Sequence, residues 1–282
     1  MSEERRPGLP GDSHVHSEWS WDAPYTSMVS ACERAIGLGL PSIAFTEHAD
    51  FTVRSIGHIE PSEWQRPLVT DGMLTPPPFD VEGYAECLNR CRERFPGIRI
   101  LSGVELGEPH LHERRVVETL RRAEFDRVLV SMHTLPSADS GRTTVDAAFA
   151  NAPAADVVRT YLRQVLSLVS GFCDFDVLAH IDYAARYWPS SAGEYRPEDF
   201  EDEYRAVLSM LAARGKALEV NTCGPLHVDI LRWWHELKGS AITFASDAHR
   251  PEQVARRFEE AATLAEAAGF AAVDPHGLWR AR

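Results

Sequence analysis

Cysteine is scarce in this chain, and the five that it has follow no recognisable pattern. They are scattered, odd in number and include no Cys-x-x-Cys pair. This usage argues against a disulfide-stapled secreted domain and against a zinc site built from thiolates. We therefore expect reduced thiols and a cytoplasmic protein.

Long apolar runs and excess positive charge are also missing. No run approaches the ~20 residues that span a bilayer, and residues 1–10 are charged and contain proline, unlike a signal peptide. The formal net charge of −13 argues against a nucleic-acid polymer or a membrane as partner. We expect a single domain over 1–282 with a flexible tail at 1–10, since 282 residues can bury a core without covalent staples.

What is present is an alternation of short apolar runs with longer amphipathic stretches. This alternation is typical of a βα repeat with a mainly parallel sheet. Apolar runs that lead into polar residues predict seven strands, and amphipathic stretches with Gly or Pro near their ends predict helices. Together with the polar residues that they lead into, the strands cover 12–16, 41–48, 98–105, 127–133, 175–182, 216–222 and 241–249, with the last strand itself at 241–245. The helices cover about 26–38, 80–95, 111–122, 156–169, 197–213 and 251–268.

Each predicted strand ends in a polar or ionisable side chain. The carboxyl ends of parallel strands converge on one face of a barrel or sheet, which is where ligands bind. Six of the twelve histidines fall at this one topological position, more than solvation of strand ends explains. The sequence therefore predicts a shared site formed by His14, His16, His48, Glu105, His133, His180, Asn221, Asp247 and His249.

Imidazole and carboxylate groups dominate this predicted site. Along an extended segment Asp12, His14 and His16 share one face, so the two imidazoles lie side by side. Nitrogen and oxygen donors without thiolate suit Zn²⁺, Mn²⁺, Fe²⁺ or Co²⁺ better than Ca²⁺. The candidates are too many for one ion, so we expect two or three divalent ions, with Glu105 as the natural bridge.

Taken in order, these segments resemble the successive motifs of the PHP (polymerase and histidinol phosphatase) family. The similarity covers residues 12 to about 250, and it is closest to the stand-alone histidinol-phosphatase type, partly because of Glu-Val-Asn-Thr at 219–222. The motifs are Asp-Ser-His-Val-His at 12–16, Thr-Glu-His at 46–48, Gly-Val-Glu at 103–105, Ser-Met-His at 131–133, Ala-His-Ile-Asp at 179–182 and Ser-Asp-Ala-His at 246–249.

The resemblance implies an α/β fold, a distorted (β/α)7 TIM-like barrel, with a trinuclear metal centre at its C-terminal face. It also assigns the ligands by position, with Asp22 at a place where some relatives carry histidine. The first ion takes His14, His16, Glu105 and Asp247, the second Glu105, His133 and His180, and the third Asp22, His48 and His249.

The implied activity is hydrolysis of a small phosphate monoester, with L-histidinol phosphate as the suggested substrate. Divalent ions lower the pKa of bound water towards ~7, so that hydroxide is available at neutral pH. Glu105, Asp247 and His249 are the predicted catalytic residues. Two alternatives stay open: a phosphoesterase for another metabolite such as a nucleotide, and a non-catalytic, metal-stabilised module that binds a partner protein.

Three side chains are predicted to contact the substrate. Arg186 suits phosphate because guanidinium pairs with it in a bidentate geometry, although it equally fits a surface arginine. Arg250 is a second candidate, and Asn221 either donates to phosphate or satisfies backbone groups at the barrel rim. Asp12 is predicted to accept a ring N–H from a metal-binding histidine; the alternative is that it caps the first turn beyond the strand.

Two long segments, 49–79 and 134–153, interrupt the regular βα rhythm. Both follow strands that carry site residues, and long irregular segments inside a domain often act as lids or binding loops. We predict that they shape the pocket for the leaving group; the alternative is that they are disordered crossings.

Overall fold

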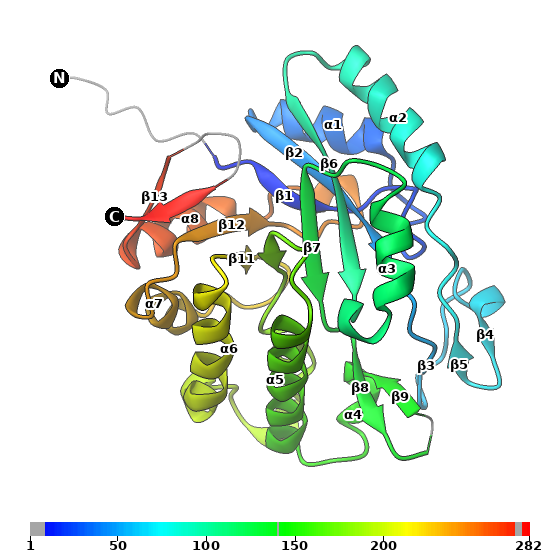
Figure 1. The fold of residues 1–282 in the computed structure, drawn as a ribbon, viewed down its shortest axis with the longest axis vertical. Coiled ribbons are helices and arrows are strands. Elements are labelled where there is room, and N and C mark those ends of the chain that lie inside the picture. Colours follow the sequence, from blue (N-terminus) through cyan, green and yellow to red (C-terminus); the bar gives the residue numbers. More distant parts are fainter. Residues whose placement is uncertain (1–8, 140, 274–277) are drawn as a thin grey trace.

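A closed barrel of seven parallel strands forms the centre of the protein (Figure 1). The computed structural model describes residues 9–139, 141–273 and 278–282, so residues 1–8 of the expected tail lie outside it. The last barrel strand pairs with the first, which confirms the predicted distorted (β/α)7 barrel. In spatial order the strands are β1 (Asp12–Val15), β2 (Ser42–Ala49), β6 (Arg99–Gly107), β7 (Arg127–Ser131), β10 (Val177–Leu178), β11 (Ala217–Asn221) and β12 (Ala241–Ala245).

The barrel is distorted at β1 and at β10. The register between β1 and β2 shifts between Asp12 and Val15, and β10 contributes only two residues. Beyond the strands, backbone bonds continue the closure: His16 N–H donates to the Ala248 carbonyl, and Asp247 N–H donates to the His14 carbonyl, both at 2.9 Å. The segments that carry these four residues are therefore held directly against each other.

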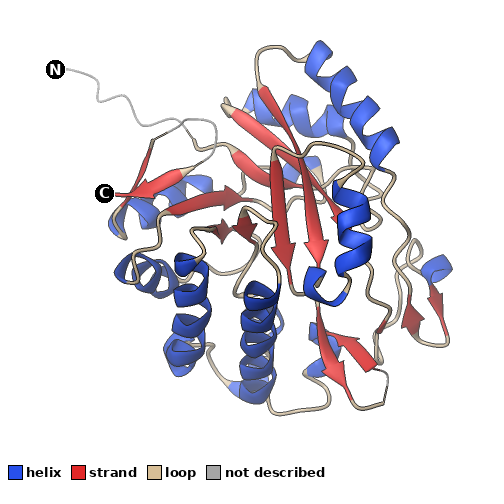
Figure 2. Ribbon diagram, viewed as in Figure 1, coloured by secondary structure: helices blue, strands red, loops and turns tan. Residues whose placement is uncertain are grey.

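Helices cover the outside of the barrel (Figure 2). All six predicted helices are present, although their first and last residues differ from the predicted ones. The structure also contains α7, which was not predicted. The last helix starts seven residues later than predicted because Pro251–Gln253 form a 3-10 turn and Ala255 and Arg257 adopt positive φ. The helices are α1 (Met28–Gly37), α2 (Val81–Arg94), α3 (Glu113–Leu120), α5 (Ala154–Gly171), α6 (Glu201–Ala213), α7 (Val228–Glu236) and α8 (Phe258–Ala267), with a short α4 (Val145–Ala148).

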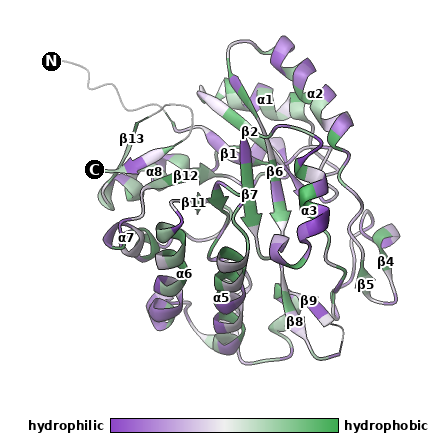
Figure 3. Cartoon of the chain, in the orientation of Figure 1, coloured by the Kyte–Doolittle hydropathy of each residue, from purple (hydrophilic) through white to green (hydrophobic). Residues whose placement is uncertain are grey.

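Apolar side chains from the strands and the inner faces of the helices form the core (Figure 3). Trp233 and Trp234 are buried, and the Trp234 indole donates to the Ala241 carbonyl at 3.1 Å. Gly239 is required beside it, because a Cβ there would lie 2.0 Å from the Trp234 ring. All five cysteines are free thiols, as predicted. None of the described helices has the length and apolar character needed to cross a membrane.

A second, smaller sheet is built from the two segments that interrupt the βα rhythm. Strands from 49–79 and 134–153 meet where Ser55 pairs with Thr143, so the described parts of these segments are structured and joined to each other. The order is β4 (Val69–Thr70), β5 (Met73–Leu74), β3 (Arg54–Ser55), β9 (Gly141–Thr144) and β8 (Thr134–Ser137). Two antiparallel strands, β13 (Phe270–Ala272) and β14 (Trp279–Ala281), extend the barrel sheet beside β12.

Candidate metal centre

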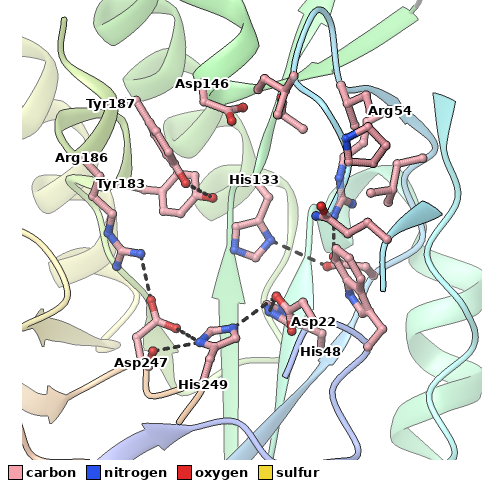
Figure 4. Close-up of a pocket in the computed structure, with 18 of the residues that line it drawn as sticks. Asp22, His48, Arg54, His133, Asp146, Tyr183, Arg186, Tyr187, Asp247 and His249 are labelled. Atoms are coloured by element: carbon pink, nitrogen blue, oxygen red, sulfur yellow. Dashed lines mark hydrogen bonds and ion pairs between the residues drawn. The ribbon is translucent and has the colours of Figure 1, made fainter. Parts of the chain in front are cut away.

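The nine predicted ligand residues lie together at the C-terminal ends of the barrel strands. Eight of them lie near the end of a barrel strand or just after it. They meet because a parallel barrel brings these strand ends to one face. Asp22 comes from the loop after β1 and faces the same cluster (Figure 4). The nine side chains are those of His14, His16, Asp22, His48, Glu105, His133, His180, Asp247 and His249.

The first group of donors surrounds one carboxylate oxygen of Glu105. His14 Nε2 lies 3.0 Å from His16 Nε2 and 3.1 Å from Glu105 Oε2. Asp247 Oδ1 lies 3.3 Å from His16 Nε2. All four side chains are buried.

The second group surrounds the other oxygen of the same carboxylate. Glu105 Oε1 lies 2.9 Å from His180 Nε2 and 3.2 Å from His133 Nε2. Glu105 therefore presents one oxygen to each of two donor groups, which is the geometry of a bridging carboxylate.

The third group is centred on Asp22. Its Oδ2 lies 3.1 Å from His48 Nε2 and 3.2 Å from His249 Nε2.

Asp50 is a further candidate ligand that the sequence did not predict. This buried carboxylate lies close to His48 and His133, on the other side of the cluster. It directly follows β2, so it occupies the same strand-end position as the other candidates.

The donor arrangement fits divalent cations. His249 Nδ1 lies 3.0 Å from the Asp247 carbonyl, which can only accept, so Nδ1 carries a hydrogen and Nε2 faces the Asp22 carboxylate at 3.2 Å, where a proton or a metal ion must lie between them. His14 Nδ1 likewise faces a carboxylate oxygen of Glu219 at 2.9 Å. Lone pairs and carboxylate oxygens that converge in a buried site need a cation between them.

The pKa values of the cluster show the same need for positive charge. Burial favours a neutral Glu105, but the imidazoles of His14 and His48 hold the pKa of that carboxyl well below its usual value. Burial favours neutral imidazoles too, yet Glu219 and Glu105 raise the pKa of His14, and Asp22 and Glu105 raise that of His48 to about 9. Protons therefore supply the positive charge in the metal-free cluster.

The predicted contact of Asp12 with an imidazole is wrong, and Glu219 makes such a contact instead. Asp12 accepts backbone N–H groups of Ser246 at 3.0 Å and Ala255 at 2.9 Å, so it joins β1 to the segment after β12. Backbone N–H groups thus satisfy the Asp12 carboxylate, and among the described residues no imidazole nitrogen is hydrogen-bonded to it. Glu219 faces His14 Nδ1 and also accepts the His180 backbone N–H at 3.0 Å.

A second buried carboxylate acts through a serine. Glu47 accepts the Ser20 hydroxyl at 2.7 Å, and Ser20 Oγ lies 2.8 Å from His16 Nδ1. Glu47 also accepts the backbone N–H of Ser17. Such partners fix the orientation of metal-binding imidazoles and are a regular part of metal sites.

A pocket of about 320 Å³ opens above the cluster. Arg186 lines it, and its guanidinium lies 2.9 Å from Asp247 Oδ2 and donates to Asn221 Oδ1 at 2.8 Å. The Asn221 amide donates to Glu219 at 2.8 Å, so both its polar atoms are used within the protein. This geometry favours a positioning role for Asn221, through Arg186, over the predicted contact with substrate.

Arg250 does not fit its predicted role. The side chain is exposed and lies over the Tyr25 ring, 5.0 Å from its centroid. It is absent from the described residues that line the pocket.

Both long segments contribute walls to this pocket. The first supplies Arg54, Ile56 and Trp64, and the second supplies Thr144 and Asp146. Trp64 pairs with Trp21 at a ring separation of 5.8 Å. This placement supports the prediction that the segments shape the pocket.

Replacing Glu219 by Gln is expected to lower activity or metal affinity about 10- to 100-fold, because the amide cannot supply both oxygens that now accept from His14 and His180. Metal content after dialysis and phosphate release together measure this. Glu93→Gln, an exposed site in α2, is the matched control. Wild-type values for Glu219→Gln would show that the ring of His14 needs no such partner.

Comparison with known proteins agrees with this geometry. A family model described as PHP domain matches residues 12–223. The chain belongs to the PHP domain family. As a PHP domain it is 27% identical to the histidinol-phosphatase of Lactococcus lactis over 267 residues, covering 92% of this chain and 91% of the relative. It is also 27% identical to a probable histidinol-phosphatase of Clostridium acetobutylicum, covering 90% and 92%.

This PHP domain also resembles solved structures. The histidinol phosphate phosphatase of Lactococcus lactis, crystallised with zinc, L-histidinol and phosphate, superposes with a TM-score of 0.76 at 25% identity. The superposition covers 93% of this chain and 95% of that protein. A putative histidinol phosphatase from Listeria monocytogenes, at 17% identity and a TM-score of 0.69, shares the fold.

Proposed function

We propose that this protein hydrolyses L-histidinol phosphate to L-histidinol and phosphate with divalent metal ions. The observation that carries the proposal is the buried cluster in which Glu105 presents one oxygen to His14 and the other to His180. The choice of substrate rests on relatives named histidinol-phosphatase, which match this chain over nearly its full length. One of them was solved with zinc, L-histidinol and phosphate.

The three donor groups would hold two or three ions. His14, His16, Glu105 and Asp247 form the first group, and Glu105, His133 and His180 form the second. The third consists of Asp22, His48 and His249. Zinc suits these donors, and Mn²⁺ and Fe²⁺ suit them too. When bound, such ions neutralise phosphate oxygens and lower the pKa of coordinated water.

The chain itself contributes orientation around the phosphate. Arg186 is anchored by Asp247 and Asn221, so its guanidinium is held at a fixed place in the pocket wall. Burial alone would lower the pKa of Arg186, but Asp247 beside it raises that pKa, so the group stays cationic. A fixed, charged guanidinium suits phosphate oxygens. In this proposal Glu105, Asp247 and His249 act as metal ligands, and Asp247 and His249 also line the pocket.

Phosphate release from a panel of esters tests the proposal. Protein is stripped of metal and reloaded with Zn²⁺, Mn²⁺ or Fe²⁺, and L-histidinol phosphate is compared with sugar, nucleotide and aryl phosphates. We expect metal-dependent turnover with the highest kcat/KM for L-histidinol phosphate. Preference for a nucleotide or sugar phosphate would change the substrate and keep the chemistry, whereas inactivity on every ester would favour a non-catalytic partner-binding module.

A further inference from the structure

The pocket extends beyond the metal cluster to a carboxylate that lacks a cationic partner. Asp146, in α4, lines the pocket and is half-buried. Figure 4 places it at the opposite end from Asp22, Asp247 and His249. Its one hydrogen bond among the described residues comes from the backbone N–H of Ala147, at 2.8 Å.

The other acidic residues of the pocket wall are already compensated. Asp22 faces His48 and His249, Asp50 lies 3.2 Å from the Arg54 guanidinium, and Asp247 lies 2.9 Å from that of Arg186. Among the described residues of this wall, Asp146 is the carboxylate with no ion pair. A half-buried carboxylate without a counter-charge favours binding of a cation.

Hydroxyl groups surround the same end of the pocket. Tyr187 donates to the Tyr183 hydroxyl at 3.0 Å, and both tyrosines line the pocket. Thr144, two residues before Asp146, lines it as well, and its hydroxyl has no hydrogen-bond partner among the described residues. These oxygens can accept further N–H groups from a ligand held by the carboxylate.

We propose that Asp146 binds a protonated nitrogen of the leaving group, with the hydroxyls of Thr144 and Tyr187 completing the subsite. The inference rests on the proposed function, because it takes the phosphate to lie over the metal cluster beside Arg186. A cationic leaving group neutralises Asp146, whereas a neutral alcohol leaves it unpaired and partly desolvated. The subsite therefore selects phosphate monoesters that carry an ammonium or imidazolium group.

Asp146→Asn tests this inference, because Asn retains the side-chain oxygen that accepts the Ala147 N–H and removes only the charge. We expect kcat/KM for L-histidinol phosphate to fall about 10- to 100-fold, while that for 3-phenylpropyl phosphate, which carries no cation, stays unchanged. Asp139→Asn, an exposed site in the turn between β8 and β9, is the matched control. Equal losses on both esters, or no loss on either, would overturn the subsite.

Two further esters identify the nitrogen. L-Alaninol phosphate carries only the ammonium, and 3-(imidazol-4-yl)propyl phosphate carries only the imidazole. Asp146→Asn should impair whichever ester presents the bound cation. Impairment of neither, with L-histidinol phosphate unaffected, contradicts the proposal.

Calorimetry with L-histidinol separates this inference from the proposed function, because binding needs no turnover. Wild-type protein should bind L-histidinol at least about tenfold more tightly than Asp146→Asn does. If that difference holds while no ester of the panel is hydrolysed, the subsite stands and the proposed function fails. If L-histidinol phosphate is hydrolysed but the variant binds and turns over like wild type, the function stands and the subsite fails.

Discussion

Replacing Glu105 by Gln is expected to lower kcat/KM for L-histidinol phosphate on the order of a thousandfold. Its two oxygens face His14 and His180 from one buried position, and an amide can offer only one of them as an acceptor. The variant should also retain less metal after dialysis, because two donor groups share this carboxylate.

Glu93→Gln provides a control for the chemical change itself, since Glu93 is exposed in α2. Circular dichroism and thermal unfolding show whether each variant is folded. A folded Glu105→Gln protein with wild-type metal content and turnover would contradict the bridging assignment.

Loss of metal from the His180→Ala variant should parallel the loss from Glu105→Gln, because both residues belong to the second donor group.

Removing the metal is expected to abolish turnover and to lower the melting temperature by about 10 °C. Tight ligands stabilise a folded protein by about 4 kcal/mol at a thousandfold excess over Kd, and each kcal/mol is worth roughly 2–4 °C in a protein of this size. Differential scanning calorimetry before and after chelation measures the shift. Reloading with Zn²⁺ should restore both properties; an unchanged melting temperature on chelation would mean that no ion is bound in the cluster.

The same experiment has a pH dependence with a definite sign. In metal-free protein Glu219 and Glu105 hold the pKa of His14 above its unfolded value, and Asp22 and Glu105 raise that of His48 to about 9. A raised pKa stabilises the fold below the unfolded value of about 6.5, and this contribution is lost as pH rises towards about 9. Metal competes with these protons, so the stabilisation by Zn²⁺ should grow over the same interval.

The parallel sheet and the meeting of its strand ends were predictable from periodicity, whereas closure into a seven-stranded barrel depended on the family resemblance. Each apolar run ends in a ligand-type residue, and parallel strands bring such ends together whatever the details of packing. Glu105 was predicted as the shared carboxylate because the ligands are too many for one ion and a carboxylate can bridge two, and its two oxygens face different donor groups. The loop residue Asp22 depended on the family resemblance, since nothing in its spacing places it near His48.

Other features depended on contacts between segments far apart in the chain. Glu219 alternates with Asn221 on β11, which would have placed both on one face, but its partner His14 lies 205 positions away. The second sheet joins strands of two to four residues from 49–79 and 134–153, too short to give a clear period. Arg250 follows His249 directly in the sequence, yet its side chain lies over the Tyr25 ring and outside the described pocket lining, a placement that sequence proximity did not indicate.

The most direct test of the central claim is a titration of metal-free protein with Zn²⁺, with kcat/KM for L-histidinol phosphate measured at each equivalent bound. We predict no turnover without metal, and an increase that reaches its plateau only when two or three ions are bound per chain. Full turnover in metal-free protein, or a plateau at a single ion, would contradict a shared multi-metal centre.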